Sequence, residues 1–209
     1  MKFLSKLILS SCLILACLNC KDNKIRVKTE SEFQKQTNAL FKDATQSPLK
    51  PEIQKDFKSL PFFPIDSSFV VVATIQKTPE AEFFDMKTTT SRLSKERVFG
   101  VLTFVIKGNS CRLNLYQTKR SITSVDAQLF LPFLDDTNGL LTYGGGRYMD
   151  LEIPETDQIW LDFNKAYNPY CAYNERYSCP IVPRENYIPL EIKAGVMYNS
   201  DLLSYKHTD

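Results

Sequence analysis

The chain has 209 residues, of which 43% are hydrophobic and 24% charged, a balance that favours one globular domain and excludes a disordered or fibrous chain. Its 26 basic and 24 acidic residues give a formal charge of +2, so the sequence predicts no nucleic-acid partner. The single histidine, His207, lies two residues from the C-terminus, which argues against Ser-His-Asp triads, Cys-His pairs and HExxH zinc sites inside the fold.

Residues 1–16 have the layout of a secretory signal peptide. Lys2 and Lys6 precede a short apolar run that is too short to span a bilayer as a helix. The Ile-Leu-Ala-Cys sequence that ends at Cys17 resembles the lipobox of bacterial lipoproteins, in which a small residue precedes the lipidated cysteine. Cys17 is therefore the predicted lipidation site. Cys20 is a rival, and an ordinary secreted protein is the alternative.

Residues 17–30 are mostly polar and charged, as suits a tether between a lipid and a folded domain. Cleavage before Cys17 would remove Lys2 and Lys6 and leave 24 basic against 24 acidic side chains. The formal charge thus belongs to the targeting signal. We expect a cell-envelope location with the membrane contacted through the N-terminal lipid; which membrane, and which face of it, stay open.

Residues 31–209 form a single predicted β-rich domain that begins with a helix. Ser31 is the expected N-cap and Glu32 lies in the first turn, where an acidic side chain is favourable. Phe33, Leu40 and Phe41 recur at helical spacing, and the proline at 48 marks the end of this segment.

After residue 66 the apolar residues alternate with period two, which is typical of strands. Tight turns are expected at residues 107–110, with glycine first in the turn, and at 136–139. The predicted fold is mainly β, an antiparallel barrel or sandwich with one N-terminal helix and a long Tyr/Asn/Pro-rich loop region. The predicted strands are Phe69–Gln76, Phe83–Thr88, Arg97–Lys107, Ser110–Thr118, Gln128–Leu134, Arg147–Ile153, Gln158–Phe163 and Ile188–Lys193.

The sequence changes character after about residue 128. Seven of the ten tyrosines fall between Tyr143 and Tyr187, and three glycines are consecutive at 144–146. The stretches 129–135, 142–148 and 162–180, the last containing Tyr-Asn-Pro-Tyr-Cys-Ala-Tyr-Asn, resemble the bacterial family catalogued as domain of unknown function 1684. The resemblance covers about residues 31–195 and implies a single domain in an exported lipoprotein of Bacteroidetes-like bacteria. It implies no activity, cofactor or catalytic residue.

Two cysteines, Cys171 and Cys179, bracket part of the tyrosine-rich stretch. In an exported protein we predict a disulfide between them. A metal site or a reactive thiol is the alternative, although a metal needs two further ligands. Cys111 alternates with Leu113 and Leu115 and is expected to face the core.

Asp150 and Asp162 lie on two successive predicted strands. If the apolar faces of these strands align in a hairpin, the two carboxylates lie side by side on the opposite face. Such a pair could hold a cation or act in acid/base catalysis, and a solvated sheet face is the alternative. A one-residue slip in register would separate the two residues.

The three glycines before Arg147 could form a concave row of N–H groups that, with the guanidinium, binds an anion; a simple turn is the alternative. We therefore expect a domain that binds a small polar ligand, such as a glycan, a peptidoglycan fragment or an anion. A carboxylate-dependent hydrolase using Asp150 and Asp162 and a structural envelope lipoprotein are the alternatives. No cofactor and no metal ion are indicated. The candidate ligand-binding residues are Tyr143, Gly144, Gly145, Gly146, Arg147, Asp150, Asp162, Asn164, Tyr167 and Asn168.

Overall fold

The computed structural model describes residues 30–124 and 127–198. The predicted signal peptide, Cys17, Cys20 and almost all of the tether lie outside these residues. Within the described part of the chain, no helix is both long and apolar enough to cross a membrane.

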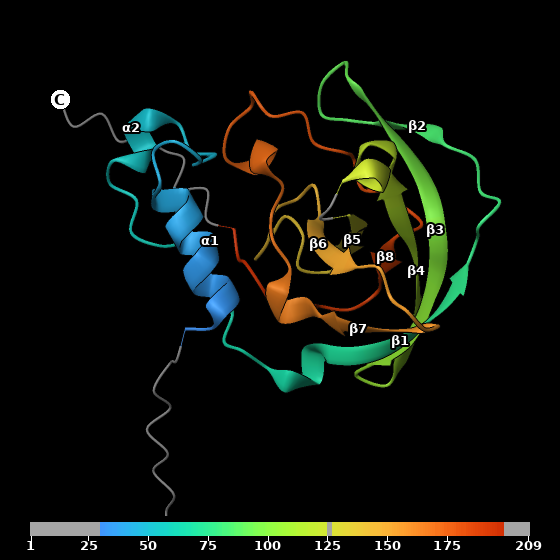
Figure 1. The fold of residues 1–209 in the computed structure, drawn as a ribbon. Helices are drawn as coiled ribbons and strands as arrows, with labels where there is room; N and C mark the ends of the chain where they lie inside the picture. The colour runs from blue at the N-terminus through green and yellow to red at the C-terminus, as the bar shows by residue number, and fades with distance from the viewer. Residues whose placement is uncertain (1–29, 125–126, 199–209) are drawn as a thin grey trace, which may run out of the picture.

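One curled sheet organises the domain, as Figure 1 shows. Its strands follow the order β6-β5-β4-β3-β1-β7, β2 pairs with β3, and β8 joins β5 as the one parallel neighbour among the described strands. The sheet forms a half-barrel, which confirms the mainly β prediction. The strands are β1 (Val70–Lys77), β2 (Phe84–Lys87), β3 (Leu93–Ile106), β4 (Asn109–Thr118), β5 (Gln128–Asp135), β6 (Arg147–Glu152), β7 (Gln158–Asp162) and β8 (Tyr187–Ile188).

Short helices connect and flank the strands. The longest, α1, begins after Ser31, whose side chain accepts a hydrogen bond from Gln34 N while the Gln34 side chain accepts one from Ser31 N. This capping box satisfies two N–H groups that the first helical turn leaves free, as expected for Ser31. The helices are α1 (Glu32–Lys42), α2 (Pro51–Gln54) and the 3-10 turns η1 (Ser67–Phe69), η2 (Lys119–Thr123), η3 (Phe163–Lys165) and η4 (Tyr170–Ala172).

The main core fills the inside of the curl. Alternate residues of most strands point into it, among them Leu102, Leu131 and Leu161, each without exposed surface. A second cluster forms where Phe41 of α1 packs edge-on against Tyr173, with ring centroids 4.9 Å apart. In Figure 1, α1 and α2 accordingly lie beside the sheet, away from the β3 side.

The β3–β4 hairpin turns through two residues. Ile106 pairs with Asn109, and both intervening residues, Lys107 and Gly108, have positive φ angles of 49° and 79°. Two positive φ angles are characteristic of a type I′ turn, whose twist matches that of the flanking strands. The predicted turn is therefore present one residue earlier, with glycine second rather than first.

Strands β6 and β7 do not form the predicted hairpin. β6 pairs with β5 and β7 pairs with β1, at opposite ends of the strand order. The free edge of β6 instead contacts the chain beyond β7, where Tyr148 and Tyr167 exchange backbone hydrogen bonds. The prediction failed because alternation identifies the face of a strand and not its neighbour.

A bulge in β3 sets which residues reach the face opposite the main core, here called the outer face. Before it, Val98 pairs with Tyr116; after it, Gly100 pairs with Leu115. The extra residue moves the even-numbered positions of β3 from the outer face to the core. Glu96 therefore lies on the outer face, on the same side as Asp150 of β6.

Candidate functional site

A pocket of about 490 Å³ lies on the outer face, between α1, β6 and residues 167–180, which we call the tyrosine segment. Among the described residues that line it, Asp150 carries the only charged side chain. Helix α1 supplies one wall and the tyrosine segment the other. The lining residues are Phe33, Gln36, Thr37, Leu40, Tyr148, Asp150, Tyr167, Pro169, Tyr170, Tyr177, Ser178, Cys179 and Pro180.

Asp150 and Tyr167 form the polar centre of this pocket. The Tyr167 hydroxyl donates to Asp150 Oδ2 at 2.6 Å. Asp150 is accessible from the pocket, yet the surrounding protein removes enough water to raise the pKa of its carboxyl, against the lowering effect of the Tyr167 hydrogen bond. Burial also raises the pKa of Tyr167 well above its ordinary value. The pair thus presents a carboxylate that is open to the pocket and has lone pairs left for a ligand.

Three further tyrosines, Tyr148, Tyr170 and Tyr177, line the pocket together with Tyr167. Tyr148 stands edge-on to Tyr167 with centroids 6.0 Å apart, and Tyr170 stands edge-on to Tyr177 at 5.3 Å. The Tyr148 hydroxyl donates to the Pro180 carbonyl, which holds the tyrosine segment against β6. Such packing fixes the rings before any ligand arrives.

A second, more polar pocket of about 440 Å³ adjoins the first, because Asp150 and Pro180 line both. Glu96 lies in its wall, 1% exposed, and accepts hydrogen bonds from the Ser94 and Thr118 hydroxyls. Burial raises the pKa of Glu96. Glu96 was not among the residues predicted from the sequence, because only the β3 bulge brings it to the outer face.

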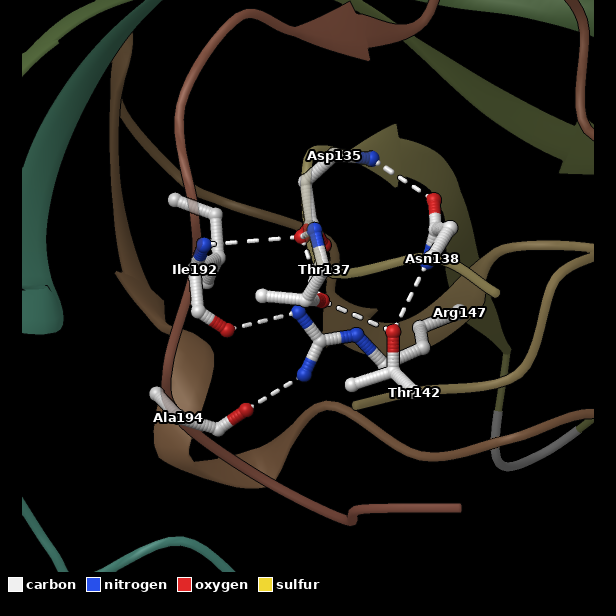
Figure 2. Close-up of polar contacts among 7 residues, drawn as sticks. All are labelled: Asp135, Thr137, Asn138, Thr142, Arg147, Ile192 and Ala194. Atoms are coloured by element: carbon white, nitrogen blue, oxygen red, sulfur yellow. Dashed lines mark hydrogen bonds and ion pairs between the residues drawn. The ribbon is translucent and has the colours of Figure 1, made fainter. Parts of the chain in front are cut away.

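Arg147 does not bind an anion here, since it is completely buried. Its guanidinium donates to Asp135 Oδ2 at 2.6 Å. It also donates to the carbonyls of Ile192 and Ala194, as Figure 2 shows. The guanidinium N–H groups that were predicted to bind an anion therefore bond to groups inside the protein. The sequence pattern could have indicated this burial, because Arg147 alternates in phase with Met149 and Leu151, which face the core.

The glycine run forms a turn that leads into Arg147. Gly146 has a φ of +89°, and a Cβ there would lie 2.8 Å from the Phe133 carbonyl. Its N–H donates to the Tyr143 carbonyl and is thus used within the turn. Gly144 and Gly145 are exposed, and the run lies outside the pocket lining. Glycine is required here for conformation and space, and the turn alternative holds.

Asp162 and Asn164 belong to the opposite end of the strand order from Asp150. Asp162 accepts a hydrogen bond from Asn164 N. The Asn164 side chain accepts a hydrogen bond from the backbone N–H of Asp66 and donates one to the backbone carbonyl of Asp66. The predicted pairing of Asp150 with Asp162 is therefore wrong.

Asn168 is buried and donates to the Tyr173 hydroxyl and the Met197 carbonyl. Of the ten candidates, only Asp150 and Tyr167 meet at the pocket.

Cys171 and Cys179 lie next to each other as free thiols, so the predicted disulfide is not formed in this structure. Cys171 N donates to Cys179 Sγ at 3.2 Å. Cys111 is a buried free thiol in the main core, as expected.

Three comparisons with known proteins bear on this fold. A solution NMR structure of an uncharacterized protein from Haloarcula marismortui is 33% identical, covers 79% of this chain and 90% of that chain, and superposes with a TM-score of 0.64. No curated protein matches the sequence. Residues 55–197 match the family model described as DUF1684, protein of unknown function. The match covers more than half of the chain, so this protein belongs to the DUF1684 family.

Proposed function

We propose that the domain binds a small, neutral, hydroxyl-rich ligand of the sugar type in the pocket around Asp150. The observation that carries the proposal is a carboxylate that accepts a hydrogen bond from Tyr167 in a pocket lined by four tyrosines. Sugar rings offer C–H faces that pack on aromatic rings and hydroxyls that donate to carboxylates.

Electrostatics distinguish this ligand from the anion also considered from the sequence. Asp150 is the only charged group among the described lining residues. A second negative charge beside this carboxylate would be repelled by it. Gln36, Thr37 and Ser178 add neutral hydrogen-bonding groups to the wall. The proposal is therefore narrowed to neutral sugars and excludes anionic ones.

Binding measurements on Asp150 variants test this proposal. Calorimetric titration with neutral mono- and oligosaccharides, and with uronates for comparison, should find neutral ligands favoured. Asp150→Asn should weaken binding by about 10–100-fold, because charge-assisted hydrogen bonds contribute roughly 1.5–3 kcal/mol. Binding to the wild type should also weaken as pH falls through the raised pKa of Asp150, since the protonated carboxyl accepts less strongly.

Glu152→Gln is the matched control, because Glu152 lies on the same strand and face as Asp150 but outside the pocket lining. It should leave affinity unchanged. Equal affinity of Asp150→Asn and the wild type for every bound sugar would remove Asp150 from the proposal. If no neutral sugar binds at all, the alternative of a structural envelope protein is favoured.

A hydrolytic role is the second candidate function. Because Asp162 does not lie beside Asp150, this role needs another carboxyl group as the partner of Asp150. Glu96 and Asp150 both line the second pocket, and burial raises the pKa of each. A raised pKa suits a general acid at neutral pH. Chromatography of the same incubated oligosaccharides distinguishes the candidates, because binding alone leaves them intact.

We further propose that the protein is exported and held at the cell envelope by lipid on Cys17. The lipobox-like residues before Cys17 and the polar tether after it support this proposal. Metabolic labelling with a fatty-acid analogue in a bacterial host should mark the wild type and Cys20→Ser, whereas Cys17→Ser should lose the label. Loss in Cys20→Ser alone would move the site to Cys20, and an unlabelled wild type would contradict the lipid anchor.

A further inference from the structure

Cys171 and Cys179 bring two thiols together from separate parts of the tyrosine segment. Cys171 belongs to η4. Cys179 comes just before Pro180, which forms a β-bridge with Thr88, the residue after β2. The backbone N–H of Cys171 reaches Cys179 Sγ at 3.2 Å, so the sulfur of Cys179 lies at the start of the η4 turn. The two cysteine side chains therefore lie in contact with each other.

The surroundings of Cys171 favour its thiolate. Hydrogen bonds from Cys179, Thr89 and Tyr143 lower the pKa of Cys171 to about 7, against the effect of partial burial. The neighbouring thiol instead raises the pKa of Cys179, with burial as a second cause. The pair therefore begins to lose its first proton near neutral pH, and the hydrogen bonds from Thr89 and Tyr143 favour the charge on Cys171.

Each thiol also opens toward a different hollow. Cys171 is half-buried and lines a pocket of about 170 Å³ with Lys50 and Ala172. Cys179 is 7% exposed and forms part of the wall of the Asp150 pocket. Cys171 is thus the more exposed of the two cysteines and the one that a small disulfide reaches more easily.

We propose that Cys171 and Cys179 form a dithiol site that reduces low-molecular-weight disulfides by thiol–disulfide exchange. The Cys171 thiolate attacks one sulfur of the incoming disulfide, whose S–S bond breaks, and the leaving thiolate takes a proton from water. Cys179 then loses its proton to water and attacks Cys171, which releases the second thiolate, protonated in turn. Two protein thiols become one disulfide, and one external disulfide becomes two thiols.

The test exposes the reduced full-length protein to glutathione disulfide, quenches it by alkylation and assigns every cysteine by peptide mapping. The wild type should form the Cys171–Cys179 disulfide without a lasting adduct. Cys179→Ser should trap glutathione on Cys171, because no second thiol can resolve the mixed disulfide. Cys171→Ser should react at Cys179 at least about tenfold more slowly than Cys171 reacts in the wild type.

Cys111 is the internal control, since burial in the main core raises its pKa and it should stay unmodified. Modification of Cys111 as fast as Cys171 would show unselective access and overturn the proposal. A stable glutathione adduct on the wild type would show that Cys179 does not resolve it, with the same consequence. Reaction of Cys171→Ser at the wild-type rate would also overturn it, because Cys179 would then be the attacking thiol.

Discussion

Replacing Asp135 by asparagine is expected to lower the free energy of unfolding by about 3–5 kcal/mol, the cost of leaving a buried charge without its partner. Asp135 and Arg147 are both fully buried side chains, and they form an ion pair at 2.6 Å (Figure 2). Asparagine retains the shape and one acceptor oxygen for the Thr137 N–H and hydroxyl, which bond Asp135 Oδ1. The change therefore removes both the charge and the acceptor that Arg147 uses, and it leaves the Thr137 contacts in place. Equilibrium urea denaturation measures it.

The neighbouring residue provides the control. Asp136 is exposed and accepts a hydrogen bond from the Tyr187 hydroxyl, which asparagine can also accept. Asp136→Asn should change stability by no more than about 0.5 kcal/mol. Adding Arg147→Met to Asp135→Asn should recover part of the loss, because it removes the unpaired charge. If Asp135→Asn costs no more than Asp136→Asn, the ion pair does not stabilise the folded state as inferred.

Gly146→Ala is expected to destabilise the protein by about 2–4 kcal/mol, through backbone strain and a close approach. Its φ of +89° disfavours a side chain, and a Cβ would lie 2.7 Å from Val182 Cγ2 and 2.8 Å from the Phe133 carbonyl. The carbonyl is part of β5 and cannot turn aside as a side chain can. Thermal and urea unfolding would measure the loss, and the sheet should remain detectable by circular dichroism.

Gly144→Ala is the matched change within the same glycine run. Gly144 does not have a positive φ, and the atom nearest to an added methyl group, Gly139 Cα, would lie at 3.6 Å, an ordinary contact. This variant should stay within about 0.5 kcal/mol of the wild type. Equal losses for the two variants would mean that the run acts through glycine flexibility in general and not through the conformation of Gly146.

Much of the fold followed from the sequence because it depends on local patterns. Ser31 could be identified as an N-cap, since capping needs only the side chain and the N–H groups of the next turn. Seven of the eight predicted strands overlap the observed ones by most of their length. The eighth, predicted over Ile188–Lys193, shares only Ile188 with the observed strand Tyr187–Ile188. Alternation also placed Asp150 on the face opposite Met149 and Leu151, where the pocket lies.

The candidate site was predicted only in part, because its members meet through long-range pairing. Asp150 contacts Tyr167 across the free edge of β6. This contact does not arise from a hairpin, so the spacing of strands in the sequence does not predict it. Helix α1 closes the pocket from more than one hundred residues away in the sequence. Glu96 reaches the same side through one bulge in β3, which a regular alternation cannot anticipate.

Local patterns in the chain were sufficient to identify the strands, the capped helix, the family and the concentration of tyrosines after residue 143. The folded domain was needed to show that Arg147 is an internal partner of Asp135, that Asp162 lies far along the sheet from Asp150, and that two thiols meet. This division arises because periodicity specifies only the direction in which a side chain leaves its own strand. The partners of that side chain depend on how the sheet curls and closes, which is settled by packing of the whole domain.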